Sequence, residues 1–201
     1  MPPLHHRDRE MISLVVLSNS YVELTLDALR ERLEQVYPGR FLPPREKGTF
    51  IVDGNVPGVE FLIQSDIPGA AGMFLLYSVP GPYTEFSDFA EHIPDASLRQ
   101  LARAQACWLS VDLVHQYTTE EEAYRFIGSV LAHLAPRDAA VLVHPSRLMT
   151  IAFDDRVRQE LASGGAGFLE RRVARKLVSL RSIHPTRCST PHGKRRRRIS
   201  T

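Results

Sequence analysis

The sequence predicts an α+β domain in which helices cover a largely antiparallel sheet, followed by a basic C-terminal segment. Short apolar, β-branched runs alternate with amphipathic stretches whose apolar residues recur every three or four positions. Tight-turn sequences separate several of the runs, and strands joined by tight turns pair antiparallel. A composition of 43% hydrophobic and 24% charged residues fits a globular domain and excludes a wholly disordered, collagen-like or disulfide-scaffold protein.

The domain is expected to begin with a strand and a helix. Met11–Ser18 is a continuous apolar run, which is typical of a buried strand. Ser20 and Glu23 have the spacing of a capping box, so we expect a helix to start there and to end at Pro38-Gly39. Its apolar stripe consists of Val22, Leu26, Leu29, Leu33 and Val36.

Three more strands are expected before residue 80, namely Thr49–Val52, Val59–Gln64 and Met73–Val79. Asp53-Gly54-Asn55 supplies turn residues between the first and second strands, and Pro68-Gly69 separates the second from the third. Because these connections are short, we expect the strands to pair antiparallel.

The second half of the domain is expected to add helices and strands in alternation. The expected helices are Thr84–His92, Asp95–Gln105, the stretch from the capping-box spacing Thr118–Glu121 to Leu134, and Asp154–Ser163; the expected strands are Ala106–His115, Ala139–Val143 and Leu148–Phe153. This order of elements predicts a relation to a ferredoxin-like arrangement.

The chain divides into four segments. They are a disordered N-terminus over 1–10, the α+β domain over 11–165, a basic amphipathic helix over 166–184 and a disordered basic tail over 185–201. Leu169, Val173, Leu177 and Leu180 lie on one side of the basic helix, whereas the tail has no apolar periodicity that could offset the entropic cost of ordering it.

The segment from Pro82 to Gly164 resembles an uncharacterised bacterial family of small α+β domains. The resemblance rests on a polar helix pair, the strand QACWLSVD, the helix EEEAYRFIGSVLAHL and the short strand AAVLVHP. It covers less than half of the chain and contains no chemical motif. It therefore implies an α+β fold and carries over no site residue.

The formal net charge of +2 hides an uneven distribution of charge. Residues 170–201 contain 11 of the 25 Lys and Arg residues and one of the 23 Asp and Glu residues, for a formal charge of +10. Residues 1–169 therefore contain 14 basic and 22 acidic residues, for a formal charge of −8. A basic arm on an acidic domain is the expected organisation.

The sequence favours a reduced, cytoplasmic protein without a membrane span. The two cysteines, Cys107 and Cys188, do not make a disulfide framework in a chain of 201 residues. The longest uncharged stretch, Ile67–Thr84, is interrupted by Pro and Gly, and no transmembrane helix or signal peptide is expected.

No motif of catalysis, cofactor binding or metal binding is recognised, so we assign no catalytic, cofactor-binding or metal-ligating residue and expect no cofactor. Cys107 and His115 would lie about 26 Å apart along a strand. Asp112 and His115, three positions apart, would point to opposite sides unless the strand ends or bulges between them. His115 and His144 end two expected strands and could approach each other only if those strands were parallel neighbours.

Two candidate binding features remain in the domain. Trp108 alternates with the apolar positions of its strand, so we expect it on the less buried side, where it could pack against a helix. The segment Val79–Tyr83 contains two prolines and a glycine, which is typical of an ordered loop. Such a loop could contact a partner or serve as a rigid connector.

Two classes of function are therefore weighed ahead of an enzyme. The first is a non-catalytic protein-interaction domain whose acidic body contacts a protein partner. The second is a nonspecific binder of nucleic acid or another anionic surface through the basic C-terminal segment. The residues assigned to polyanion binding are Arg171, Arg172, Arg175, Lys176, Lys194, Arg195, Arg196, Arg197 and Arg198.

Overall fold

The computed structural model describes residues 12–41, 50–53, 60–83, 89–116 and 119–165. The chain separates into two compact units, 1–166 and 167–201, and the second lies entirely outside the described residues. Three predicted segments also lie outside the described residues. They are the N-terminal segment 1–10, the basic helix 166–184 and the basic tail 185–201.

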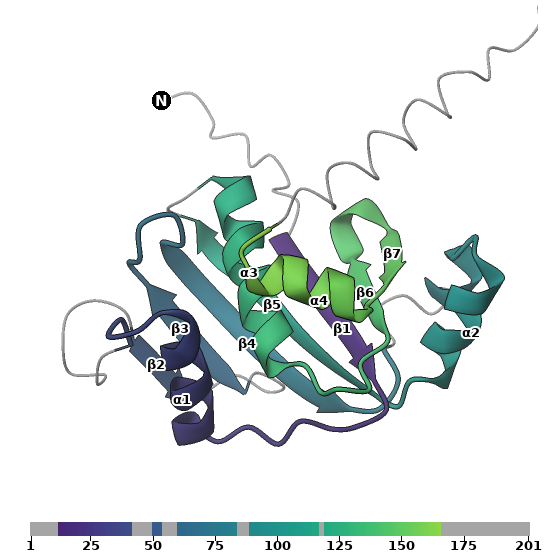
Figure 1. Ribbon diagram of the computed structural model, residues 1–201, viewed down its shortest axis with the longest axis horizontal. Coiled ribbons are helices and arrows are strands. Elements are labelled where there is room, and N and C mark those ends of the chain that lie inside the picture. The colour runs from purple at the N-terminus through teal and green to yellow at the C-terminus, as the bar shows by residue number, and fades with distance from the viewer. Residues whose placement is uncertain (1–11, 42–49, 54–59, 84–88, 117–118, 166–201) are drawn as a thin grey trace, which may run out of the picture. The chain divides into compact units, whose positions relative to one another are not determined.

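Seven strands form one sheet in the order β2-β3-β4-β5-β1-β6-β7, and each strand is antiparallel to its neighbours (Figure 1). The strands are β1 (Ile12–Ser18), β2 (Phe50–Asp53), β3 (Phe61–Ser65), β4 (Gly72–Pro80), β5 (Cys107–Gln116), β6 (Val141–His144) and β7 (Met149–Ala152). The predicted α+β class with an antiparallel sheet is confirmed.

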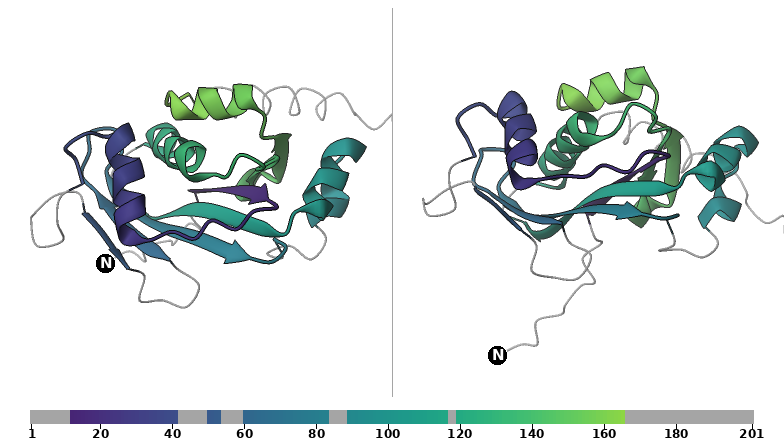
Figure 2. Two further views of the ribbon diagram at one scale, coloured as in Figure 1. Left: turned by 60° about the horizontal axis from the view of Figure 1, so that its bottom comes forward. Right: turned by 90° about the horizontal axis from the view of Figure 1, so that it is seen from below.

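Three helices lie on one side of the sheet (Figure 2). They are α1 (Leu26–Val36), α3 (Glu120–Leu134) and α4 (Asp155–Ala162). A short unit made of the 3-10 turn η1 (Phe89–His92) and helix α2 (Ala96–Ala104) contacts β6 and β7, and the 3-10 turn η2 (Pro145–Arg147) joins those two strands. We call the side under α1 and α3 the helix face, and the opposite side the open face.

The main core lies between the helix face and α3. Strand β4 alternates between buried and partly exposed positions, and its buried Phe74 and Leu76 point to the helix face. The Phe74 ring lies 4.5 Å from that of Phe126 on α3. Gly128 lets α4 pack closely on α3, because a Cβ atom there would lie 2.6 Å from a methyl group of Leu161.

Helix α3 is capped at both ends. At its N-terminus Thr119 and Glu122 form a capping box, one residue later than the spacing Thr118–Glu121 predicted. At its C-terminus, Arg158 donates hydrogen bonds to three backbone carbonyls, those of Ala132, Ala135 and Pro136, at 2.6–3.1 Å. These bonds satisfy carbonyls that a helix end leaves without a partner.

Two helix boundaries differ from the prediction. The cap of α1 is Thr25 rather than Ser20, whose hydroxyl instead donates to Asp138 at 2.8 Å. The prediction was wrong because a capping-box spacing marks a possible start, and tertiary contacts decide between several. A helix was expected over residues 84–92. Residues Phe89–His92 form a short 3-10 turn instead, and residues 84–88 lie outside the described residues.

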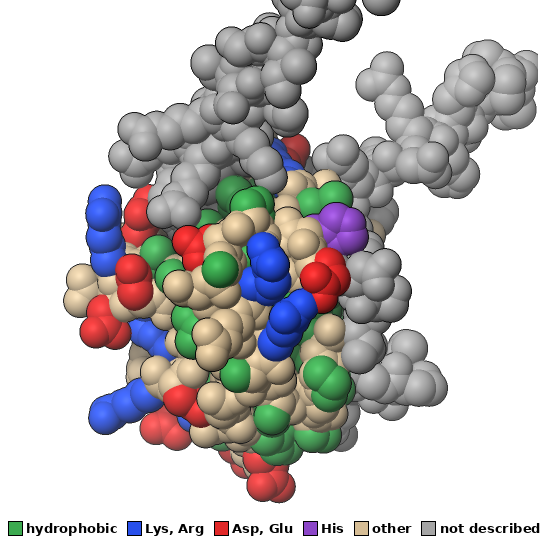
Figure 3. Space-filling model, turned by 90° about the vertical axis from the view of Figure 1, so that its right-hand side faces the viewer, with side chains coloured by type: hydrophobic (Ala, Val, Ile, Leu, Met, Phe, Trp, Pro, Cys, Tyr) green, Lys and Arg blue, Asp and Glu red, His purple; other side chains and the backbone are tan. Residues whose placement is uncertain are grey.

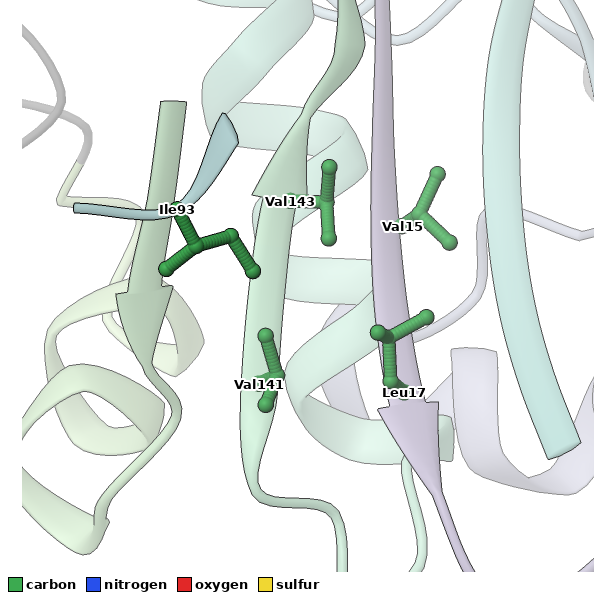
Figure 4. Packing of buried hydrophobic residues seen from close by; sticks show 5 residues of the cluster. All are labelled: Val15, Leu17, Ile93, Val141 and Val143. Atoms are coloured by element: carbon green, nitrogen blue, oxygen red, sulfur yellow. The ribbon is translucent and has the colours of Figure 1, made fainter. Parts of the chain in front are cut away.

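A second, smaller core lies on the open face, between the β1–β6 half of the sheet and the η1–α2 unit. Its buried members are Val15, Leu17, Ile93, Val141 and Val143, and their side chains gather beside strands β1 and β6 (Figure 4). Partly buried side chains from α2 and β5 pack against them, including Leu98, Ala102 and Trp108. The η1–α2 unit therefore covers only part of the open face.

Candidate interaction surface on the open face

The remaining part of the open face is formed by β3, β4 and the first half of β5. Because side chains alternate along a strand, those next to the buried Phe74 and Leu76 point away from the helices. We call this set the open-face strip; its members are Leu62, Gln64, Met73, Leu75, Tyr77, Val79 and Trp108, all partly exposed. The strand register places Leu62 beside Leu75, and Val79 beside Trp108, so the strip is continuous.

An aromatic cluster ends the strip. The Trp108 ring lies 6.2 Å from Tyr77 and 5.5 Å from Tyr83, the latter in an edge-on orientation. Tyr83 reaches Trp108 because the chain turns at Gly81, where φ is +118° and the N–H donates to the Ala106 carbonyl at 2.7 Å. The predicted loop Val79–Tyr83 is therefore ordered, and Gly81 is needed for its path.

Trp108 lies on the less buried side of its strand, as predicted. It is partly exposed, and it packs against the same buried cluster as Leu98 and Ala102 of helix α2. Its indole therefore links the second core to the open-face strip. Aromatic side chains in this setting contribute large apolar areas to protein interfaces.

A short polar group borders the strip on the β1 side. Ser13 donates a hydrogen bond to Asp112 at 2.5 Å, and Ser13 and Ser110 are buried. Asp112 pairs with Leu75 in the register of β4 and β5. Strands β1, β3, β4 and β5 contain no Lys or Arg, so no strand residue of this face supplies a positive charge.

A bulge in β5 lies between Asp112 and His115. The pairing with β4 shifts at Met73/Phe74, so that Leu113 and His115 oppose consecutive residues and Val114 is the extra residue, 56% exposed. The regular alternation expected between Asp112 and His115 is therefore interrupted. The His115 side chain lies outside the described residues.

The other sequence candidates do not form a reactive site in the described part of the chain. Cys107 is buried as predicted, and its thiol lies 3.8 Å from the Asn19 carbonyl. His115 and His144 belong to β5 and β6, which β1 separates, so these strands are parallel but not neighbours. Among the described residues, no three His, Cys, Asp or Glu side chains gather as they would around a metal ion.

His144 is a buried residue of the helix-face core. Its ring lies 4.7 Å from that of Tyr124, and its Nδ1 lies 3.3 Å from the Ser146 hydroxyl oxygen. Burial, with a smaller contribution from the charge of Arg147, lowers the pKa of His144 to about 4. The imidazole is therefore neutral at pH 7 and acts as a packing residue.

The side of the molecule that includes η1 and α2 has a different character from the strip. Figure 3 shows positive and negative side chains next to hydrophobic ones on that side. Arg103 of α2 and Glu91 of η1 form an ion pair there, and Leu101 is 42% exposed. Exposed ion pairs of this kind contribute little to binding or stability.

All nine residues assigned to polyanion binding lie outside the described residues. Comparisons of the chain with protein-family models, with curated proteins and with solved structures find no significant match. None of the helices in the described ranges is both long enough and apolar enough to cross a lipid bilayer.

Proposed function

We propose that this protein is a non-catalytic protein-interaction domain whose binding surface is the open-face strip. One observation carries the proposal: β4 is apolar on both of its sides, but described helices cover only one of them. Strands with two apolar sides are typical of sheets that are buried on both faces. A protein partner would bury the side of β4 that the described helices leave open.

The charges of the strip favour a protein over a nucleic acid as its ligand. Single-stranded nucleic acids bind to aromatic platforms that also carry positive charge along the backbone path. The strip has aromatic residues but no Lys or Arg from its strands, and Asp112 lies at its border. Phosphates would therefore be repelled where bases could stack.

Site-specific photo-crosslinking in the cells that produce the protein tests this proposal. A photoreactive residue at Leu75 should give a discrete protein adduct, whereas the same residue at the exposed Gln159 of α4 should not. A second substitution in the strip, Val79→Asp, should abolish the adduct without changing the far-ultraviolet circular dichroism spectrum. Adducts at both positions, or none at Leu75, would contradict the proposed surface.

We further propose that the core of the domain has a ferredoxin-like arrangement. In chain order its elements would be β1, α1, β4, β5, α3 and β6, and the sheet order β6-β1-β5-β4 with antiparallel neighbours supports this. The β2–β3 and β7 strands would extend the sheet at its two edges. We also propose that the protein belongs to an uncharacterised bacterial family and that it is cytoplasmic with reduced thiols.

The charge asymmetry of the sequence favours a second function, nonspecific polyanion binding through the basic segment. Residues 170–201 have a formal charge of +10, whereas residues 1–169 have a formal charge of −8. If Lys194–Arg198 contact five duplex phosphates, log K should fall with log salt with a slope of about −4.5. A full-length variant with these five residues changed to Gln should lose DNA binding, and an unchanged salt slope would contradict this function.

A further inference from the structure

We infer that the partner of the open-face strip is a single amphipathic helix of another protein, with a Lys or Arg residue that pairs with Asp112. This inference rests on the proposed function, because it specifies the chemistry of the protein that covers the strip. The position of Asp112, the dimensions of the strip and the charge of the domain support it.

Asp112 lies on the open face beside the apolar strip. It is opposite Leu75 in the register of β4 and β5, and opposite Ser13 in the register of β1 and β5. The hydrogen bond from the buried Ser13 holds the carboxylate in place, yet Asp112 stays partly exposed. Asp112 is also the one Asp, Glu, Lys or Arg residue in strands β1, β3, β4 and β5. These four strands therefore place a single negative charge beside apolar side chains.

A partner that covers the strip has to compensate for this charge. Side chains directly opposite each other on neighbouring strands have Cβ atoms about 5 Å apart, so a cover over Leu75 also removes water from Asp112. Removing water from a carboxylate costs free energy unless opposite charge and hydrogen-bond donors replace the water. A Lys or Arg of the partner supplies both, and its aliphatic stem can lie across Leu75.

The dimensions of the strip fit one helix. From Met73 to Val79 the strip is about 20 Å long, and its three strands span about 14 Å. A helix with its side chains is about 10–12 Å wide, and about 14 helical residues span 20 Å. On the opposite side of β4 the cover is also helical, because Phe74 packs against Phe126 of α3 (Figure 2). We therefore expect the apolar stripe of the partner helix to lie over β4.

The charge of the domain favours a basic partner. Because residues 1–169 have a formal charge of −8, the domain attracts a cationic segment and repels an acidic one. The projected area of the strip, about 280 Å², is well below the roughly 800 Å² of accessible surface that each partner of a stable complex buries. The complex is therefore transient, and its association rate benefits from opposite charges.

Selection from a peptide library on the full-length chain tests the inference. Each member is a helix-forming peptide of about 14 residues, with leucines fixed along one stripe and randomised positions on both flanks of the stripe. The selected peptides should contain Lys or Arg at one flanking position. Leu75→Lys should weaken their binding by more than about tenfold, because it places a cation beside Asp112. Binders without a basic flanking residue, or binders that Leu75→Lys does not weaken, would overturn the inference.

A double-mutant cycle, measured by fluorescence anisotropy, then tests the contact with Asp112. Asp112→Asn, or Gln in place of the selected Lys or Arg of the peptide, should each weaken binding by about tenfold, and the second change should add little to the first. Asp112→Asn keeps an oxygen that accepts the hydrogen bond of Ser13, and the far-ultraviolet circular dichroism spectrum should be unchanged.

The control variant removes the same charge elsewhere on the domain. Glu31→Gln changes an exposed carboxylate of α1 and should alter the affinity by less than about twofold, since long-range attraction between exposed charges is screened by salt. An equal loss in this control, or independent effects of Asp112→Asn and the peptide change, would overturn the pairing with Asp112.

The outcomes separate this inference from the function on which it rests. If Leu75 crosslinks to another protein in cells but the selected peptides show neither a basic residue nor coupling to Asp112, the inference fails and the proposed function stands. A crosslink from Leu75 to a second copy, or within the same chain, would overturn a separate helix as the partner. Neither an adduct nor a peptide that depends on Leu75 would overturn both.

Discussion

Both faces of the sheet carry apolar side chains, but the described helices cover the two faces to different extents. On the helix face, Phe74 and Leu76 have no exposed surface, because α1 and α3 lie over this side. On the open face, Leu75 and Tyr77 of the same strand remain partly exposed. Composition alone therefore does not decide which side is the core; the placement of the helices does. An apolar side that no described helix covers is a candidate surface for contact with a partner.

Substitutions at adjacent residues of β4 test this difference most directly, and they should have the largest effect. Phe74→Ala would leave a cavity against Phe126 in the main core and should lower the free energy of unfolding by about 3–5 kcal/mol. Leu75→Ala, measured in dilute solution, should lower it by about 1 kcal/mol or less, because Leu75 is partly exposed in the folded chain. Urea titrations of both variants measure these values.

Equal losses from the two alanine variants would contradict the contrast between the faces. Such a result would mean that the open-face strip is covered within a single chain.

The pH dependence of stability tests whether water is excluded from His144 on the helix face. The pKa of His144 falls from 6.5 to about 4 on folding, so between these values the unfolded chain binds more protons than the folded chain. Stability from this residue is therefore complete above pH 6.5 and is lost as the pH falls toward 4, by about 3 kcal/mol in total.

The variant His144→Phe provides the reference, since it keeps a ring beside Tyr124 but cannot bind a proton. The difference in unfolding free energy between wild type and variant, measured by urea titration from pH 8 to pH 4, should shift in favour of the variant as the pH falls. A constant difference would show that water reaches His144 and that this end of the helix face is open.

The smallest effect is expected at the β6–β7 hairpin, which lies at the edge of both faces. Leu148 is the one non-glycine residue with a positive φ in the described ranges, at +46°, and it is 61% exposed. Leu148→Gly should raise the free energy of unfolding by about 0.5 kcal/mol, because relief of the left-handed backbone exceeds the added entropy of the unfolded chain. A fall in the thermal midpoint would indicate that the Leu148 side chain has a packing role.

Much of the local structure was predictable because it depends on residues near in the chain. The continuous apolar run of β1 and the alternation of β5 predicted both strands, and the apolar alternation around Cys107 predicted its burial. Asp95 and Asp154 cap α2 and α4 close to the expected starts. The starts of α1 and α3 were displaced, because Ser20 and Thr118 compete with other capping residues nearby.

The open-face strip was not predicted, although its residues lie in three expected strands. Met73–Val79 is apolar at almost every position, so its periodicity does not distinguish one side from the other. A strand with two apolar sides is typical of a sheet that is covered on both faces. The bulge beside Val114 left no such signal, because it arises from the register between β4 and β5.

The sequence by itself determined the α+β class, most element positions and the separation of charge between an acidic body and a basic segment. These properties follow from periodicity, turn residues and composition, which act over a few residues or over the whole chain. Only the tertiary structure decided the strand order, the insertion of β1 between β5 and β6, and the side of β4 that the helices cover. These depend on contacts between residues far apart in the chain, which no local pattern encodes.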